Sequence, residues 1–535
     1  LFTWNQNNQT LGGLTIGKEG STSDIDIYLP PNPINGDVSI YGGDIELKSD
    51  INAQSGDYDI HIEGSTRVIA SSASRKVYSG SGDITLRSDI YRNSTRRIQT
   101  KTTGLLTIEP YTNAWSSDTT VGIQGTVFNF DGTISSGNYI GSVDSDWLEI
   151  NQIASLGGLK IGKTTSTSGV SIEVPLNIAG PLTIYGTDIS VNENLNTTIN
   201  GPINLYGGAV AVNAPLTATD DTISITSSTS LTDGASGYLV ASGLALKGSG
   251  SVTLDNALND VGTIAAGSDD DSAIGALSFT NKEALTIGTV NPSGISSTGP
   301  ITIKTLSGDL TISEDITTTD TSSDAIRLYA DVNKSAGDAT GGNIKISGTP
   351  AISTGSGGTA KLYSGSAENS TGLSALVDAA NLRYNVDATT TSFDPAISSG
   401  NYVLYRERDV NDNANLSSLT TSSGTLTPVF DSATTSYSLV LAAGTTSVNF
   451  TPTTDDSGAT LTINETAHTS GASYTASGLK AYQEYSIEVT ASDETTTKTY
   501  RLKVYVTQAT VPAPTGTWRN LFAGENFDPN DDQQA

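Results

Sequence analysis

A short segment that occurs twice in succession sets the strongest limit on how this chain can fold. The segment Gly-Pro-Leu-Thr-Ile-Tyr-Gly at 180–186 returns as Gly-Pro-Ile-Asn-Leu-Tyr-Gly at 201–207, a shift of 21 residues, and the same shift carries Leu195 onto Leu216. Within each copy, apolar residues alternate with polar ones, and Gly, Pro, Asn or Asp separate the apolar stretches. Alternation predicts strands with one buried face, and a fixed period predicts that equivalent strands stack on one another. We therefore expect a parallel β-solenoid.

Apolar triplets with one polar residue in the middle repeat through much of the chain. In the first part they are spaced by 24, 22, 24 and 22 residues and begin at Leu14, Val38, Ile60, Ile84 and Leu106. In the second part the spacing is 23, 21, 20 and 21 residues, for triplets that begin at Leu159, Leu182, Ile203, Ile223 and Leu244. A Gly-Asp or Gly-Gly pair precedes several of them, which is typical of tight corners. Farther on the spacing drifts, so we expect loops or hairpins between the later turns.

A longer duplication divides the repetitive part of the chain in two. The phrase Leu-Gly-Gly-Leu-Thr-Ile-Gly-Lys at 11–18 returns as Leu-Gly-Gly-Leu-Lys-Ile-Gly-Lys at 156–163. The segment at 130–139, which contains Ile-Ser-Ser-Gly-Asn-Tyr, has a counterpart at 393–402. Each copy thus opens on one phrase and closes on the other, which indicates two consecutive solenoid cassettes. The predicted cassettes are residues 1–145 and 146–405.

The pattern changes after a short charged stretch at 406–414, which we interpret as a linker. From 415 to 507 the strands are longer, and turn residues recur at the spacing that is typical of an antiparallel β-sandwich. The tail at 508–535 is rich in Pro, Asn and Asp, and we interpret it as an extended segment or the start of a further module. The predicted fold class is therefore all-β, a parallel β-solenoid (β-helix) followed by an antiparallel β-sandwich of the immunoglobulin type.

Charge and residue usage exclude several classes of function. The net charge of −29, from 27 basic and 56 acidic residues, would repel nucleic acid and suits an extracellular protein. The chain has no Cys, which excludes disulfides, cysteine–zinc sites and thiol catalysis. No apolar run is long enough to cross a membrane, so no membrane span is expected. The chain also has no Met, from which we expect it to be a processed piece of a longer protein.

The predicted sandwich resembles the cadherin-like β-sandwich repeats of bacterial surface proteins. The residues that carry this resemblance are Leu-Ser-Ser-Leu at 416–419, Gly-Thr-Leu-Thr-Pro-Val-Phe-Asp at 424–431, Tyr437 and the segments at 489–493 and 496–500. The solenoid is similar, in its style of repeat, to the β-helical stalks of filamentous-haemagglutinin-type exoproteins. The combination resembles the giant secreted adhesins of gliding and filament-bearing Bacteroidota. The resemblance implies an extracellular fibre on the cell surface that attaches to glycans, surfaces or other cells.

The predicted linker carries one candidate metal site. Asp409, Asn411, Asp412 and Asn413 resemble the Asp-x-Asn-Asp-Asn linker of true cadherins, whose oxygens hold calcium between domains. Carboxylate and amide oxygens are suitable ligands for a hard cation such as Ca²⁺. In this chain Ala414 stands where that motif has Pro. The alternative is a solvated hinge in which Asn and Asp form turns, and no other cofactor is expected.

The sign of the charge reverses between residues 63 and 101. This stretch holds eight of the 27 basic residues and three acidic ones, 8 − 3 = +5. Residues one turn apart lie side by side on a solenoid, so basic side chains could form a stripe. We predict a contact for an anionic glycan or for an acidic neighbouring subunit, formed by Arg87, Arg92, Arg96 and Arg97. The alternative is a basic loop that offsets the acidic surface.

The sequence gives little support for catalysis, and we expect the chain not to be an enzyme. Its two histidines, His61 and His468, fall in different predicted domains, so no local histidine pair is available. A β-helix enzyme that cleaves acidic polysaccharides with paired carboxylates stays open as an alternative, as does a phage or viral tail fibre. The expected partners are copies of the same chain, because open solenoid ends and strand edges need caps or neighbours, and also surface glycans or other cells.

Overall fold

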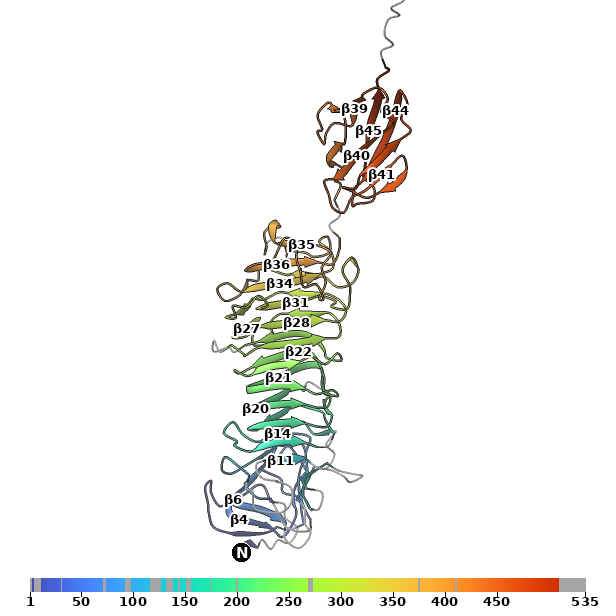
Figure 1. Ribbon diagram of the computed structural model, residues 1–535. Helices are drawn as coiled ribbons and strands as arrows, with labels where there is room; N and C mark the ends of the chain where they lie inside the picture. Colours follow the sequence, from blue (N-terminus) through green and yellow to red (C-terminus); the bar gives the residue numbers. More distant parts are fainter. Residues whose placement is uncertain are drawn as a thin grey trace, which may run out of the picture. The chain divides into compact units, whose positions relative to one another are not determined.

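The computed structural model shows an all-β chain that forms two separate units, Leu1–Arg408 and Asp409–Ala535 (Figure 1). The structure describes residues 2–3, 11–29, 31–70, 74–91, 98–115, 127–130, 138–142, 145–150, 155–173, 175–198, 201–267, 273–373, 376–408 and 411–509. The 3₁₀ turn η3 (Ala379–Asn381) lies among these residues, nearly all of whose regular structure is β-strand. The described part of the chain therefore contains no helix with the length and apolar character that crossing a bilayer requires.

The first unit is a parallel β-solenoid in which each turn pairs with the turn one repeat later. Leu182 pairs with Ile203, and Ile203 pairs with Ile223, in parallel register, which confirms the predicted stacking of the 21-residue repeat. One ladder runs the length of the coil, through β2 (Leu14–Ile16), β4 (Val38–Leu47), β6 (Ile60–Ala70), β8 (Ile84–Ser88), β10 (Leu105–Glu109), β14 (Gly158–Ile161), β17 (Leu182–Tyr185), β20 (Ile203–Val212), β21 (Leu216–Asp233), β22 (Leu239–Lys247), β24 (Asp260–Ala266), β26 (Leu285–Ile287), β29 (Leu310–Ile312) and β32 (Ile344–Ile346). We call it the first ladder.

In the described part of the chain, a second ladder runs from β11 (Val127–Phe130) to the end of the unit. It also crosses β20 and β21, because these long strands bend from one face of the coil to the next. Its other members are β15 (Gly169–Ile172), β18 (Asp188–Val191), β23 (Ser251–Leu254), β25 (Leu277–Asn281), β28 (Ile301–Thr305), β31 (Ile326–Tyr329), β34 (Thr359–Ser364) and β36 (Gly400–Tyr405). The strand β35 (Leu382–Arg383) pairs with β36 at the end of this ladder.

Shorter strands complete each turn. Near the N-terminus these are β1 (Phe2–Thr3), β3 (Ile25–Tyr28), β5 (Ile51–Ala53), β7 (Arg75–Ser79), β9 (Ile98–Lys101) and β13 (Ser145–Ile150). The strand β12 (Asn138–Ser142) is different, because it pairs antiparallel with both β11 and β13. In the middle they are β16 (Leu176–Ile178) and β19 (Leu195–Thr197), which follow the second ladder in each turn. Later they are β27 (Ile295–Ser297), β30 (Ile316–Thr318) and β33 (Ile352–Ser353), which instead follow the first ladder.

The inward positions of the strands form one continuous apolar core. Ile184, Leu205 and Ile225 occupy the same position in successive turns, and each is fully buried. Alternate residues of a strand point to opposite faces, so the polar residues between them lie on the outside. Because every turn repeats this arrangement, the core is a column of Ile, Leu and Val side chains along the coil axis.

Corner residues explain why Gly and Asp precede so many triplets. The Asp37 carboxylate accepts the backbone N–H of Asp59 at 3.1 Å, Asp59 accepts that of Asp83 at 2.8 Å, and Asp83 accepts that of Leu105 at 2.8 Å. Each corner aspartate therefore satisfies a backbone donor of the next turn, which the parallel ladder leaves unpaired at the bend. The corner residues thus lock one turn to the next.

The two Leu-Gly-Gly phrases form the same turn. Gly17 and Gly162, which end the strands β2 and β14, have positive φ values of 75° and 76°. The next residue of each turn donates its N–H to a serine hydroxyl, Lys18 to Ser21 at 3.2 Å and Lys163 to Ser166 at 3.0 Å. The left-handed backbone here requires glycine, so this turn explains why the phrase is kept in both copies.

The second unit is a β-sandwich of two sheets. The strands of the smaller sheet are β37 (Leu416–Thr421), β40 (Ser447–Thr454) and β43 (Tyr474–Ser477). Those of the larger sheet, in spatial order, are β38 (Leu426–Thr427), β39 (Ser436–Leu441), β45 (Thr497–Val506), β44 (Tyr482–Thr490), β41 (Thr460–Ile463) and β42 (Thr466–His468). All pairs are antiparallel except β39 with β45, which are parallel. Phe450, Tyr437 and Tyr500 are buried between the sheets.

Candidate functional site

The predicted calcium ligands begin the second unit. Asp409 lies outside the described residues. The side-chain oxygens of Asn411 and Asn413 accept the backbone N–H groups of Asn413 and Asn415 at 2.9 and 3.1 Å, so both side chains already form turns. The Asn413 amide also donates to Asp455 at 2.9 Å. Among the described residues, no three acidic, histidine or cysteine side chains gather where a metal ion could be held. Calcium at Asp409, Asn411, Asp412 and Asn413 stays a prediction.

The predicted basic stripe is described at one of its four residues. Arg92, Arg96 and Arg97 lie outside the described residues. Arg87 lies on the outer face of β8, where its guanidinium contacts two carboxylates from the neighbouring turns. An anionic ligand at Arg87 would therefore have to compete with partners that the chain itself supplies.

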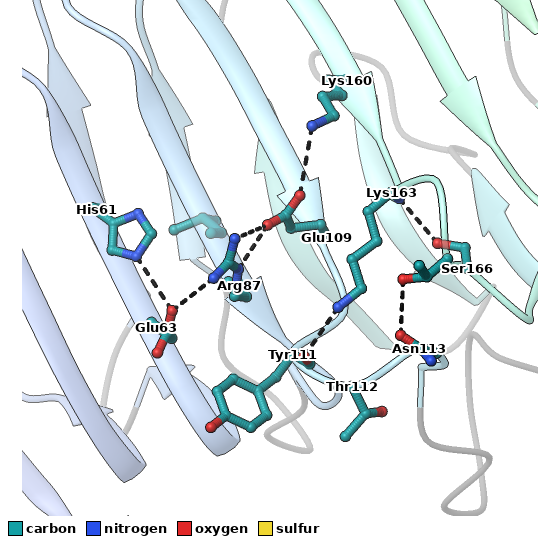
Figure 2. A network of polar contacts seen from close by, with 12 residues as sticks. His61, Glu63, Arg87, Glu109, Tyr111, Thr112, Asn113, Lys160, Lys163 and Ser166 are labelled. Carbon is teal, nitrogen blue, oxygen red and sulfur yellow. Dashed lines mark hydrogen bonds and ion pairs between the residues drawn. The ribbon is translucent and has the colours of Figure 1, made fainter. Parts of the chain in front are cut away.

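Arg87 belongs to a ladder of alternating charges on three successive turns (Figure 2). Glu63, Arg87 and Glu109 occupy the same register position on β6, β8 and β10. The Arg87 guanidinium lies 3.0 Å from Glu63 Oε2 and 2.6 Å from Glu109 Oε1. Lys160 Nζ extends the series at 3.6 Å from Glu109 Oε2, and His61 Nε2 lies 3.6 Å from Glu63. The two glutamates are nearly inaccessible to solvent, whereas about a third of Arg87 is exposed.

Electrostatics within this charge ladder favour its ionised form. Burial tends to lower the pKa of Arg87, but the hydrogen bond to Glu109 and the negative charges of Glu109 and Glu63 raise it above its ordinary value. Nearby, burial lowers the pKa of Lys163, whose ammonium donates to the Tyr111 carbonyl at 3.1 Å. Each charge has an opposite charge one turn away, so the charge ladder joins turns across the outside of the coil.

The sequence interpretation missed Glu109, one of the two acidic partners of Arg87. The basic stretch of the sequence covers residues 63 to 101, so Glu109 lies outside it. A signal was available, because Glu63, Arg87 and Glu109 follow three consecutive triplets and share their spacing of 24 and 22 residues. On a solenoid, residues at that spacing are neighbours.

The two histidines lie in packing environments. His61 is next to Tyr41, with ring centroids 5.2 Å apart. His468 Nε2 lies 3.0 Å from the carbonyl of Ala472, and its ring meets Tyr474 edge-on. They belong to different units, and the nearest acidic neighbour of His61, Glu63, is held by Arg87.

The architecture defines the class of protein: a parallel β-solenoid followed by a β-sandwich. Residues 416–507 match the family model described as a cadherin-like beta sandwich domain, which agrees with the resemblance drawn from the sequence. A search of curated proteins finds no match for the chain. Cadherin-like domains are typically extracellular.

Proposed function

We propose that the chain is a structural and adhesive segment of a large extracellular fibre on a cell surface. The observation that supports this most is the first ladder, which pairs backbone groups turn by turn from β2 to β32. Such a ladder makes a stiff column whose length grows with the number of repeats. A cadherin-like sandwich follows it in the same chain. The fibre would attach to glycans, surfaces or other cells through many weak contacts multiplied along its length.

The proposal has two further parts. The chain would belong to a secreted adhesin of the Bacteroidota type, as the resemblance of its sequence implies, and it would assemble with copies of itself. The proposal also includes the absence of catalysis. Two acidic side chains of the first unit illustrate other roles, since Asp83 accepts a backbone N–H at a corner and Glu109 pairs with Arg87. In these roles the carboxylates face backbone or basic groups of the chain itself rather than a substrate.

The test is adhesion by the protein itself. Beads coated with the full chain should bind to glycan-coated surfaces or to cells, and beads coated with a neutral carrier protein should not. The same preparation should leave uronic-acid polysaccharides uncut, measured by the release of new chain ends. If the beads bind no glycan, surface or cell, the adhesive role is wrong. Cleavage of the polymer would favour a β-helix enzyme instead.

A further inference from the structure

The outer face of the second ladder carries a groove of about 500 Å³ over β25, β28 and β31. Ile301 and Ile303 of β28 point into the core, so the alternate residues of that strand face outward. The floor of the groove is formed by Thr280, Lys304 and Tyr329, which share one register position in three successive turns. This volume is in the range of ordinary small-molecule sites.

Two basic side chains enter the groove from adjacent strands. Arg327 on β31 donates to the Thr302 hydroxyl at 3.3 Å and lies 3.8 Å from Asp324, a carboxylate that Lys361 holds more closely at 2.8 Å. Its Nε is buried and has no hydrogen-bond partner in the described part of the chain. Lys304 on β28 forms no ion pair with any described carboxylate. Lys304 therefore retains its hydrogen-bonding capacity for a ligand, and the partly exposed guanidinium of Arg327 adds a second positive charge at the groove.

The one carboxylate among the described residues that line the groove, Asp255, already accepts hydrogen bonds from neighbouring hydroxyls. Asp255 accepts hydrogen bonds from the Ser278 hydroxyl at 2.8 and 2.9 Å and from the Thr280 hydroxyl at 3.0 Å. Lys304 and Arg327 outnumber this carboxylate in the lining, and Lys361 offsets the charge of Asp324 beside them, so the groove is locally positive in a chain whose net charge is −29. The positive charge distinguishes this groove from its acidic surroundings.

One side of the groove, which begins at Tyr329, is apolar. Tyr329 is 6% exposed and stacks on Tyr363, with centroids 4.3 Å apart and planes at 15°. Leu306 and Val332, which follow β28 and β31, continue this side. The aliphatic carbons of Leu306 and Val332 suit the C–H face of a sugar ring, while paired cations suit an anionic substituent on that ring.

We propose that this groove binds an anionic sugar residue of an acidic polysaccharide. Arg327 and Lys304 hold the anionic group, and Leu306 and Val332 contact the ring. The inference rests on the proposed function, because it names the class of glycan to which the adhesive segment attaches. Acidic surroundings do not prevent such binding, since at physiological ionic strength charges more than about 8 Å away are largely screened.

The test is a calorimetric titration of the full chain with defined oligosaccharides. Trigalacturonate supplies carboxylates, a sulfated trisaccharide supplies sulfates, and maltotriose is the neutral probe. We expect binding to one or both anionic probes and no binding to maltotriose. Lys304→Gln and Arg327→Gln should each weaken that binding by about tenfold, which corresponds to about 1.4 kcal/mol. Arg327→Lys, which keeps the charge, should retain most of it.

A matched control is Lys345→Gln on β32. This lysine is also half-exposed on the solenoid, but it belongs to the first ladder and is paired with Asp309 at 2.6 Å. Its removal should leave the affinity unchanged. Equal binding of maltotriose, no binding of either anionic probe, or full affinity in the Lys304→Gln and Arg327→Gln variants would each overturn the proposal.

The outcomes separate this inference from the proposed function. If beads coated with the doubly substituted chain still adhere as the unsubstituted chain does, the groove is not the adhesive site, although the adhesive role stands. If the unsubstituted beads adhere to nothing while the chain binds an anionic trisaccharide in solution, the groove assignment stands and the adhesive role is wrong.

Discussion

The solenoid and the sandwich bury the same kinds of side chain but connect them differently. In the solenoid, Ile225 packs between Leu205 and Leu246, its partners one turn before and one turn after. In the sandwich, Tyr437 on β39 pairs with Leu502 on β45, which lies near the other end of the domain sequence. Stability in the first unit is therefore a sum of nearest-neighbour terms, whereas the second has one shared core. The loss of stability caused by the same kind of substitution should therefore extend over different distances in the two units.

The largest effect is expected in the shared core. Phe450 is fully buried and contacts the rings of Tyr474 and Tyr485. Phe450→Ala should lower the free energy of unfolding of the sandwich by about 3–5 kcal/mol, because it leaves a cavity at the centre of both sheets. Hydrogen exchange measured by mass spectrometry should show faster exchange in every strand from β37 to β45.

The control for this substitution is Val440→Ala. Val440 lies on the outer face of β39 and is 56% exposed, so its truncation should change exchange little. Faster exchange in solenoid peptides of the Phe450→Ala chain would contradict the independence of the two units.

A smaller and more local effect is expected in the solenoid. Ile225→Ala should cost about 2–5 kcal/mol in local stability, since it also opens a cavity. Exchange should rise in the turns that contain Leu205 and Leu246 and stay unchanged in β28 (Ile301–Thr305), several turns away. The outward-facing neighbour gives a control, Thr226→Ala, which leaves the core intact. Loss of protection along the whole coil would show that the solenoid unfolds as one unit and would remove the contrast with the sandwich.

The stacking of the solenoid was predictable because the buried positions of each turn recur in the sequence as alternating apolar residues. The inward residues of β17 and β20 differ in identity, yet both strands keep apolar residues at alternate positions and the spacing of 21 residues. The parallel register that follows from this pattern is confirmed. The sandwich was predictable from longer strands and closer turns, although its one parallel pair, β39 with β45, has no signature in the spacing.

The drift of the later triplets has a physical cause that the sequence pattern does not carry. The single strand β24 is matched by two strands in the next turn, because Ile264 pairs with Ile287 of β26 and Ala266 pairs with Ile295 of β27. A long loop also separates β31 from β32, so that Leu310 pairs with Ile344 across 34 residues. Residues in loops and corners have no apolar period, so neither change could be located from the sequence.

Site residues were harder to predict than strands because their neighbours come from other turns. Arg406 illustrates this, because a charged stretch suggested a linker there. In the structure Arg406 is 2% exposed and donates to the carbonyls of Ala330 and Gly342 at 2.5 and 2.8 Å. Lys304 and Arg327 have no signal in the sequence, since neither lies in a cluster of charge along the chain. The surroundings of Arg406 and of the groove are both formed by residues from neighbouring turns rather than by neighbours in the sequence.

The buried hydroxyl group of Tyr500 joins β37 and the segment at Ser432 to the sandwich core. The Tyr500 hydroxyl accepts the N–H of Leu416 at 3.0 Å and donates to the carbonyl of Ser432 at 2.8 Å. Tyr500→Phe should destabilise the sandwich by about 1–3 kcal/mol, because it leaves a buried N–H without a partner. Chemical denaturation monitored by sandwich-specific exchange measures this loss. An unchanged midpoint would mean that water replaces the hydroxyl.

The smallest effect is expected at two turn aspartates, Asp338 of the solenoid and Asp493 of the sandwich. Both are partly exposed, and both have a pKa lowered from 3.8 to about 2. Hydrogen bonds from Thr340 lower the pKa of Asp338, and Lys334 adds an ion pair at 3.3 Å. Hydrogen bonds from Thr496 and Thr495 lower that of Asp493.

Because the folded-state pKa of each carboxyl lies below that of the unfolded chain, each contributes stability that is complete above about pH 4. That contribution is lost as the pH falls toward about 2. Added salt screens the ion pair but leaves the hydrogen bonds. NMR titration of the two carboxyls should therefore show the pKa of Asp338 rising with salt more than that of Asp493. Equal responses would mean that Lys334 contributes nothing, and that both turns are held by hydrogen bonds alone.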